Sequence, residues 1–192
     1  MIALASWWSC NAFLPVIITG LARAAAQLRD LDRAATLALV ESWKLRTTLV
    51  FNFGGLLGTL LTVPIARRFG RRAMFALYFA ASAAAILCTF GMDLAAPVRL
   101  SMFFLIGLTV YGVFGAFSYY MPELFPTRLR TTGVGFCYNI GLVLAAVGPW
   151  LVGAAAARGL AIPTLFYVGF VPLLVLSLSP WFIETRHAVL AG

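Results

Sequence analysis

The stretch from Tyr119 to Asn139, YYMPELFPTRLRTTGVGFCYN, places one carboxylate and two guanidinium groups between two apolar runs. Glu123 can form an ion pair with Arg128, with Arg130 or with an arginine elsewhere in the chain. An exposed ion pair adds only about 0–1 kcal/mol to stability, so stability is a poor reason for this cluster. A pair that forms in one conformation and breaks in another can bias a conformational switch by that amount. The loop therefore predicts reversible ion pairing.

Two further segments carry charges of the same kind. PIARRFGRR, from Pro64 to Arg72, holds four arginines in six positions, and Gly70 permits a tight reversal there, with positive φ if needed. WFIETRHAV near the chain end adds two more charged residues. A plain topology anchor is the alternative for the arginine loop taken alone. Together the segments predict one gate of charges, with the members Arg68, Gly70, Arg71, Arg72, Glu123, Arg128, Arg130, Glu184 and Arg186.

Polar side chains inside the apolar runs are candidates for contact with a solute. Asn11, Asn52 and Asn139 each lie within such a run, and Tyr111 offers a ring with a hydroxyl group. A buried amide is unfavourable unless it is hydrogen-bonded, so these four residues are expected to line a substrate pathway. The small residues around them have an alternative role, because a pattern such as Gly54-x-x-x-Gly58 lets helices pack closely.

The sequence lacks the groups that acid–base, nucleophilic or metal chemistry requires. Its one histidine, His187, is close to the end, and neither G-x-S-x-G nor H-E-x-x-H occurs. Cys10, Cys88 and Cys137 are isolated from one another and are expected to be small buried hydrophobes. We therefore predict that the protein is not an enzyme, with no catalytic residues, no metal and no cofactor.

The composition indicates which elements position these groups. Hydrophobic residues make up 62% of the 192 positions and charged residues only 10%, against about 25% in soluble domains, and the mean hydropathy is +0.98. Backbone polar groups in lipid must bond within their own segment, which favours helices. The fold class predicted is all-α, a polytopic membrane bundle of six transmembrane helices in one domain, 1–192. The apolar runs are about 1–21, 48–66, 73–91, 99–121, 132–153 and 161–183.

Residues 22–47 and 184–192 lie outside these runs. Leucines and alanines in 22–47 recur at near-helical spacing between charges, which predicts an amphipathic helix at the outer surface, with a prolonged first membrane helix as the alternative. With both termini in the cytoplasm, seven basic residues lie on the inner side and two on the outer side, if 22–47 is set aside. The five basic residues of 22–47 make the two sides equal. The short loops favour a multi-pass plasma-membrane protein with cytoplasmic termini and a short inner tail, 184–192.

The net charge is +8, which in a soluble protein would suggest nucleic acid as a partner. Here the arginines cluster in short loops between apolar runs, so the lipid bilayer is the partner expected, and nucleic acid is not. A cleaved signal peptide competes for residues 1–24, because ARA at 22–24 resembles a cleavage site. No basic residue precedes the apolar run, which disfavours cleavage.

YMPELFPTRLRTTGVGF resembles the loop after the tenth helix in the metabolite and sugar symporter branches of the major facilitator superfamily. ARRFGRR is similar to the second copy of that superfamily's inner-loop motif, and FIETRHA is similar to the tail of its sugar porters. Arg67 stands where an Asp is usual, Val63 where a Gly is usual, and Leu142 where relatives often have a basic residue. The resemblance implies the C-terminal six-helix half of a transporter, with the N-terminal six-helix bundle as a partner.

The function that this resemblance implies is transport of a small organic solute by alternating access. Sugars, sugar acids and carboxylates are all open as substrates, and so are coupling to an ion and uniport. A truncated, non-transporting membrane remnant or partner subunit is the alternative, because 192 residues encode only half of such a carrier.

Overall fold

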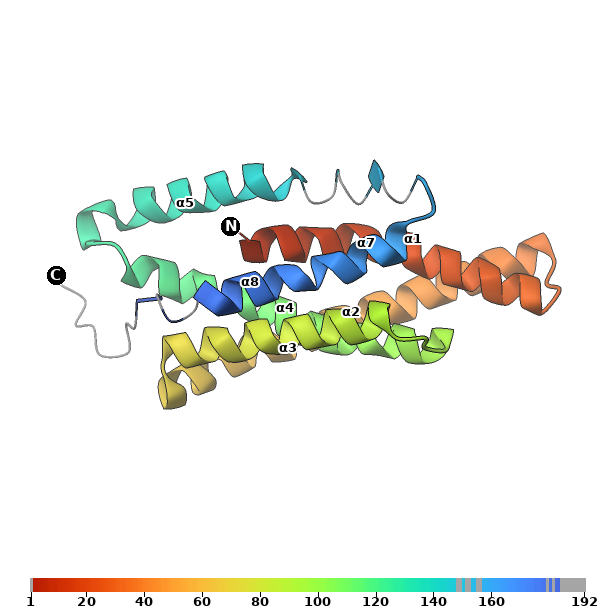
Figure 1. Cartoon of the computed structure of the whole chain (residues 1–192), viewed down its shortest axis with the longest axis horizontal. Helices are drawn as coiled ribbons and strands as arrows, with labels where there is room; N and C mark the ends of the chain where they lie inside the picture. The colour runs from red at the N-terminus through yellow and green to blue at the C-terminus, as the bar shows by residue number, and fades with distance from the viewer. Residues whose placement is uncertain are drawn as a thin grey trace.

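The computed structural model describes residues 2–147, 150, 153–154, 157–178, 180 and 182–183 (Figure 1). Within these residues the chain forms helices and turns and no strand, which confirms the all-α class. The elements are α1 (Ile2–Leu28), α2 (Arg33–Phe69), α3 (Arg71–Gly91), α4 (Ala96–Glu123), the short 3₁₀ helix η1 (Thr127–Leu129), α5 (Arg130–Ala145), α7 (Ala161–Val168) and α8 (Phe170–Leu178).

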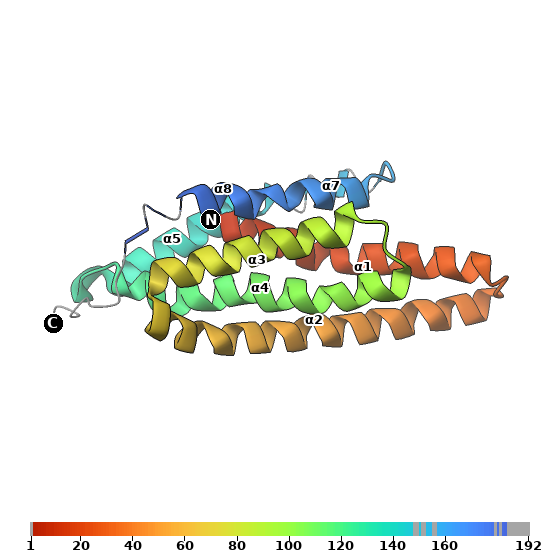
Figure 2. The same cartoon turned by 60° about the horizontal axis from the view of Figure 1, so that its bottom comes forward.

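Within the described residues, four helices are long and apolar enough to cross a membrane. They are residues 11–28 of α1 and the whole of α2, α3 and α4. A shorter apolar helical stretch, Ile162–Leu178, covers most of the sixth run. α3 and α4 extend the runs 73–91 and 99–121 by a few residues at their ends. The described helices lie nearly side by side along one direction, as expected for a polytopic bundle (Figures 1 and 2).

The prediction of a separate amphipathic helix in 22–47 is wrong. Residues 22–28 complete α1, and residues 33–47 form the first part of α2, which continues without a break to Phe69. The Asp32 carboxylate caps α2 by accepting a hydrogen bond from the Ala35 amide at 2.7 Å. The charged residues of 33–47 interrupt the apolar pattern but do not interrupt the backbone hydrogen bonding. The alternative of a prolonged first helix is correct for residues 22–28.

α2 and α4 pack closely along glycines, where the backbones of the two helices are in direct contact. A Cβ atom at Gly54 would overlap the Phe104 carbonyl oxygen, and one at Gly58 would overlap the Leu108 carbonyl group. From the other side, Gly107 leaves no room for a Cβ beside Phe51. We call these contacts the glycine seam. The Gly54-x-x-x-Gly58 pattern therefore serves close helix packing, as its alternative interpretation predicted.

Two clusters of buried side chains follow one another along the bundle. The first joins α1, α2, α3, α4 and α7 around Ile18, Phe51, Ile86 and Phe103. The second joins α2, α3, α4 and α8 around Phe75 and the residues that surround it. Among its described residues, α5 contributes none to either cluster, and Figure 1 shows it at the edge of the bundle along α1. Among the α-helices, α5 is therefore the one that contributes least to these clusters in the described part of the chain.

Candidate functional site

An ion pair joins α3 to α4 at the end of the bundle where α2 turns into α3. Arg71 donates from Nε to Glu123 Oε2 at 3.2 Å and from Nη2 to Oε1 at 2.7 Å. The two side chains are 17% and 19% exposed, so the pair is shielded from most of the solvent. The Arg71 guanidinium also lies 5.3 Å from the centre of the Tyr119 ring. We call Arg71 and Glu123 the latch pair, and this end of the bundle the latch end.

Gly70 explains how Arg71 reaches this position. It is the one residue between α2 and α3, its φ is 94°, and such a conformation favours glycine. The positive φ considered for Gly70 from the sequence is thus confirmed. Because α3 starts directly after this reversal, the Arg71 side chain faces the last turn of α4, where Glu123 ends the helix. Of the partners open to Glu123 in the sequence, the structure selects an arginine of the other loop.

Two hydrogen bonds tie the C-terminal described segment to the latch end. Arg72 donates from Nη2 to the carbonyl oxygen of Pro180. The Tyr120 hydroxyl donates to the Ile183 carbonyl oxygen at 2.9 Å. Both interactions bring residues more than 60 positions apart into contact. The third segment of the predicted gate therefore reaches the same end, although Glu184 and Arg186 themselves lie outside the described residues.

The remaining predicted gate arginines differ in their surroundings. Arg130 donates from Nε to the Pro122 carbonyl oxygen at 3.1 Å, which fixes the start of α5 against the end of α4. Arg68 and Arg128 are exposed at the same end, and so is Arg67. The structure thus brings the predicted arginines to one end of the bundle and gives only some of them a defined partner there.

Asn52 and Tyr111, predicted for the substrate pathway, lie together. The Tyr111 hydroxyl donates to Asn52 Oδ1 at 3.2 Å, and Asn52 Nδ2 donates to the Thr48 carbonyl oxygen in its own helix at 2.8 Å. The Tyr111 ring fills the space beside Gly55, which explains the small residue at that position. The pair belongs to the α2–α4 contact, next to the glycine seam.

The other two predicted pathway residues are not joined to this pair. Asn139 is exposed on α5, and its Nδ2 donates to the Gly135 carbonyl oxygen at 2.8 Å. Asn11 is half-buried on α1. No contact between α2 and α5 occurs in the described part of the chain, so Asn52 and Asn139 lie on separate parts of the bundle.

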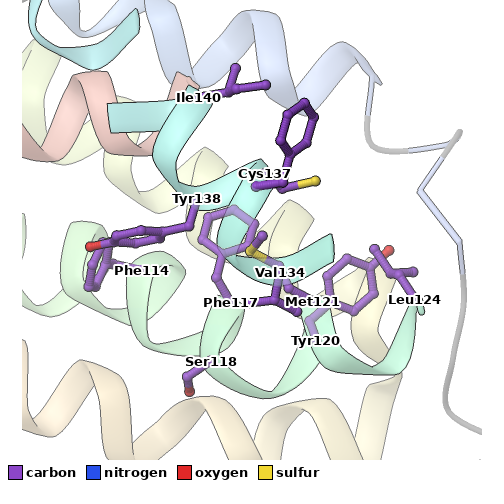
Figure 3. A pocket seen from close by; sticks show the side chains of 11 residues that line it. Phe114, Phe117, Ser118, Tyr120, Met121, Leu124, Val134, Cys137, Tyr138 and Ile140 are labelled. Atoms are coloured by element: carbon purple, nitrogen blue, oxygen red, sulfur yellow. The ribbon is translucent and has the colours of Figure 1, made fainter. Parts of the chain in front are cut away.

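A pocket of about 430 Å³ lies between α4 and the first half of α5 (Figure 3). We call it the aromatic pocket. Its lining is mostly apolar and comes from two helices, with residues Phe114, Phe117, Ser118, Tyr120, Met121, Leu124, Val134, Phe136, Cys137, Tyr138 and Ile140. Phe114 and Tyr138 lie next to each other at one side of it in an edge-on arrangement, with ring centres 6.4 Å apart. The volume is within the range of small-molecule sites, roughly 300–1,000 Å³.

The sequence prediction missed this pocket. Its walls come from faces of two helices, and each face alone looks like ordinary core, such as Phe114, Phe117 and Met121 at spacings of three and four. The prediction that the cysteines are buried is also wrong for two of them. Cys88 and Cys137 are exposed, and Cys137 lines the pocket. In a membrane bundle an apolar side chain can face lipid or a cleft without unfavourable contact with water.

No family model matches the chain. A protein of Cupriavidus pinatubonensis named as a probable 4-methylmuconolactone transporter is 31% identical over 100 residues, which is 52% of this chain and 23% of that protein. The cis,cis-muconate transport protein of Acinetobacter baylyi is 33% identical over 105 residues, 54% of this chain and 25% of its own length. The gallate transporter of Pseudomonas putida is 26% identical over 180 residues, 92% of this chain and 38% of its own length. The chain thus spans between about a quarter and two fifths of these relatives.

Proposed function

We propose that this membrane chain forms the C-terminal six-helix half of an alternating-access carrier. Its relatives are metabolite and aromatic-acid transporters of the major facilitator type. In this proposal the latch end faces the cytoplasm with both termini, and the protein spans the plasma membrane. A second, N-terminal six-helix bundle completes the carrier.

The latch pair is the observation that carries this proposal. Alternating access requires contacts that form in one state and break in the other. The latch pair joins the ends of α3 and α4, and the bonds from Arg72 and Tyr120 add the C-terminal segment. Such contacts at one end favour a closed state at that end, and their loss allows it to open. Arg68, Arg128 and the undescribed Glu184 and Arg186 are proposed as further members.

We propose organic acids as the substrates, in preference to sugars. The names of the relatives include muconate and gallate, both carboxylates. The aromatic pocket offers rings for stacking with a planar solute, and the described residues of its lining include no charged one. Asn11, Asn52, Tyr111 and Asn139 stay the proposed polar contacts along the pathway. Leu142 supplies no charge, so the carboxylate needs a cationic partner other than this position.

Uptake into lipid vesicles tests this proposal. Vesicles contain the chain alone, or the chain together with the N-terminal bundle of the Pseudomonas putida gallate transporter. Labelled benzoate and labelled glucose are offered in parallel. The proposal expects uptake of benzoate only when both bundles are present, and no uptake of glucose. Absence of uptake in every case contradicts transport and favours a non-transporting remnant or partner subunit, whereas uptake by the chain alone contradicts the need for a second bundle.

A further inference from the structure

A second pocket, of about 310 Å³, lies at the opposite end of α2 from the latch end. We call it the hairpin pocket, because it lies beside the turn at 29–32 that joins α1 to α2. Its lining residues come from that turn, from one face of α2 and from the first turns of α4. They are Arg29, Trp43, Arg46, Thr47, Val50, Pro97, Leu100 and Ser101.

The course of α2 and α4 explains why a pocket forms there. The α2 residues that line it, from Trp43 to Val50, continue the helix face that carries Gly54 and Gly58. At the glycine seam the two backbones are in contact. Beyond it, towards the hairpin, the α2 face carries side chains instead of glycines, and α4 starts at Ala96. Figure 2 shows α2 and α1 continuing past the α3–α4 turn, so the pocket opens where the bundle thins.

The pocket combines two cations with an apolar floor. Arg29 and Arg46 are exposed, and the structure records no ion pair for either within its described residues. Trp43 and Leu100 pack against the first core cluster, so the floor is continuous with the interior. The pocket also has two hydroxyl-bearing residues. Thr47 is buried, with 2% of its surface exposed, and Ser101 is exposed. Guanidinium groups are the side chains best suited to bind carboxylate or phosphate.

No carboxylate lines the hairpin pocket in the described part of the chain. The elements around it contain four acidic residues, Asp30, Asp32 and Glu41 in the hairpin and α2, and Asp93 in the turn before α4. Asp32 accepts from the Ala35 amide, and Glu41 pairs with Lys44 at 3.1 Å. The lining of the pocket therefore combines two guanidinium groups with hydroxyl groups and apolar surface.

We infer that the hairpin pocket binds one oxyanion, carboxylate or phosphate, carried by an amphipathic molecule, with Arg29 and Arg46 as its cationic ligands. The apolar part of the molecule lies against Val50, Leu100 and the Trp43 ring. Two sources supply this chemistry, a free organic acid and the headgroup of an anionic phospholipid. The inference does not depend on the proposed transport, because binding at this end requires neither the latch pair nor a second bundle.

Binding measurements on the full 192-residue chain in phosphatidylcholine nanodiscs test the inference. One arm measures benzoate binding by equilibrium dialysis, and the other measures retention of added phosphatidylglycerol by native mass spectrometry. The double variant Arg29→Gln with Arg46→Gln removes both cations of the pocket. Arg23→Gln with Arg33→Gln is the matched control, because it removes two exposed arginines of the same hairpin that do not line the pocket.

The inference expects the pocket variant to weaken binding by about tenfold or more in one arm, while the control changes it by less than about twofold. The arm that responds identifies the source of the oxyanion. The single variant Arg46→Gln is a milder second variant if the double variant inserts poorly, and a loss of about twofold to fivefold is expected. Equal weakening by the pocket and control variants, or binding of neither probe to the unmodified chain, overturns the inference.

Discussion

Two ion pairs in the described part of the chain differ in how much water reaches them. The latch pair is 17% and 19% exposed and bidentate, whereas Lys44 and Glu41 are 34% and 71% exposed and lie one helical turn apart. Water screens an exposed pair, and two flexible side chains lose entropy to form it. At the scale of single residues, the latch pair is therefore the charge contact able to bias a conformational equilibrium.

A double-mutant cycle measures this difference. Arg71→Gln and Glu123→Gln, singly and together, are expected to give a coupling free energy of about 1–2 kcal/mol for the latch pair. The same cycle on Lys44→Gln and Glu41→Gln is expected to give less than about 0.5 kcal/mol. Both cycles use thermal unfolding of the purified protein in detergent, followed by circular dichroism. A latch coupling no larger than that of the exposed pair contradicts the proposed switch.

Tyr111 connects packing to the proposed pathway. Its ring fills the space at Gly55, and its hydroxyl binds Asn52 Oδ1. Tyr111→Phe keeps the ring and removes the hydroxyl, so the amount of folded protein is expected to stay unchanged. The apparent affinity for benzoate in uptake with both bundles is expected to fall about twofold to tenfold, the range for one hydrogen bond. Tyr167→Phe, 69% exposed on α7, is the control. Equal effects of the two variants contradict a pathway role for Tyr111.

At the scale of elements, the glycine seam holds α2 and α4 at a distance that no larger residue allows. Overpacking a close contact is destabilising by about 1–3 kcal/mol. Gly58→Ala is therefore expected to lower the free energy of unfolding by at least this amount, because the added methyl group meets backbone atoms of Leu108, which cannot rotate away.

Gly20→Ala is the matched control for the seam. No atom of the described part of the chain lies within 4 Å of a Cβ at this helical position, so alanine is expected to raise stability by about 0.5–1 kcal/mol through its higher helix propensity. Both variants are compared with the unmodified chain by unfolding in detergent. A similar loss of stability in Gly58→Ala and Gly20→Ala would show that close packing at the glycine seam does not cause the destabilisation.

The sequence predicts some of these elements better than others, for physical reasons. α3 and α4 follow their apolar runs closely because lipid-embedded helices are defined by hydropathy. The continuity of α2 was not predicted, since Glu41, Lys44 and Arg46 lower local hydropathy while leaving helix propensity intact. The sixth run divides into α7 and α8 at Gly169, with a proline in each helix, and hydropathy does not register such a break.

The candidate site shows the same limit. The charges of the two loops were predicted from composition and motif, but Arg71 was selected as the partner of Glu123 by the reversal at Gly70. The aromatic pocket and the hairpin pocket were not predicted, because each is formed by faces of separate helices. The packing at the glycine seam and the position of α5 determine which helix faces meet. Neither can be predicted from a local sequence pattern.

At the scale of the whole molecule, α2 is longer than the membrane is thick. Its 37 residues extend about 55 Å at 1.5 Å per residue, whereas the hydrocarbon core is about 30 Å. Its N-terminal part carries Glu41, Lys44 and Arg46, and its C-terminal end carries the arginine loop. The charged part of α2 is therefore expected to extend out of the bilayer with the hairpin, as Figure 2 shows for its position relative to the α3–α4 turn.

This geometry makes a prediction about sidedness. Single cysteines at Arg67 and Arg128, in a background without the native cysteines, lie at the latch end. A cysteine at Asp30 lies in the turn between α1 and α2, and one at Arg158 lies in the turn before α7, which packs against the end of α3 away from the latch end. All four positions are exposed. Labelling of intact and permeabilised cells with a membrane-impermeant maleimide is expected to place 67 and 128 on the cytoplasmic side and 30 and 158 on the outer side, because arginines of short loops are retained inside. Labelling of positions 67 and 128 from opposite sides would contradict the arrangement of the bundle. Labelling of both from outside would show that the bundle has the opposite orientation, without affecting the latch pair.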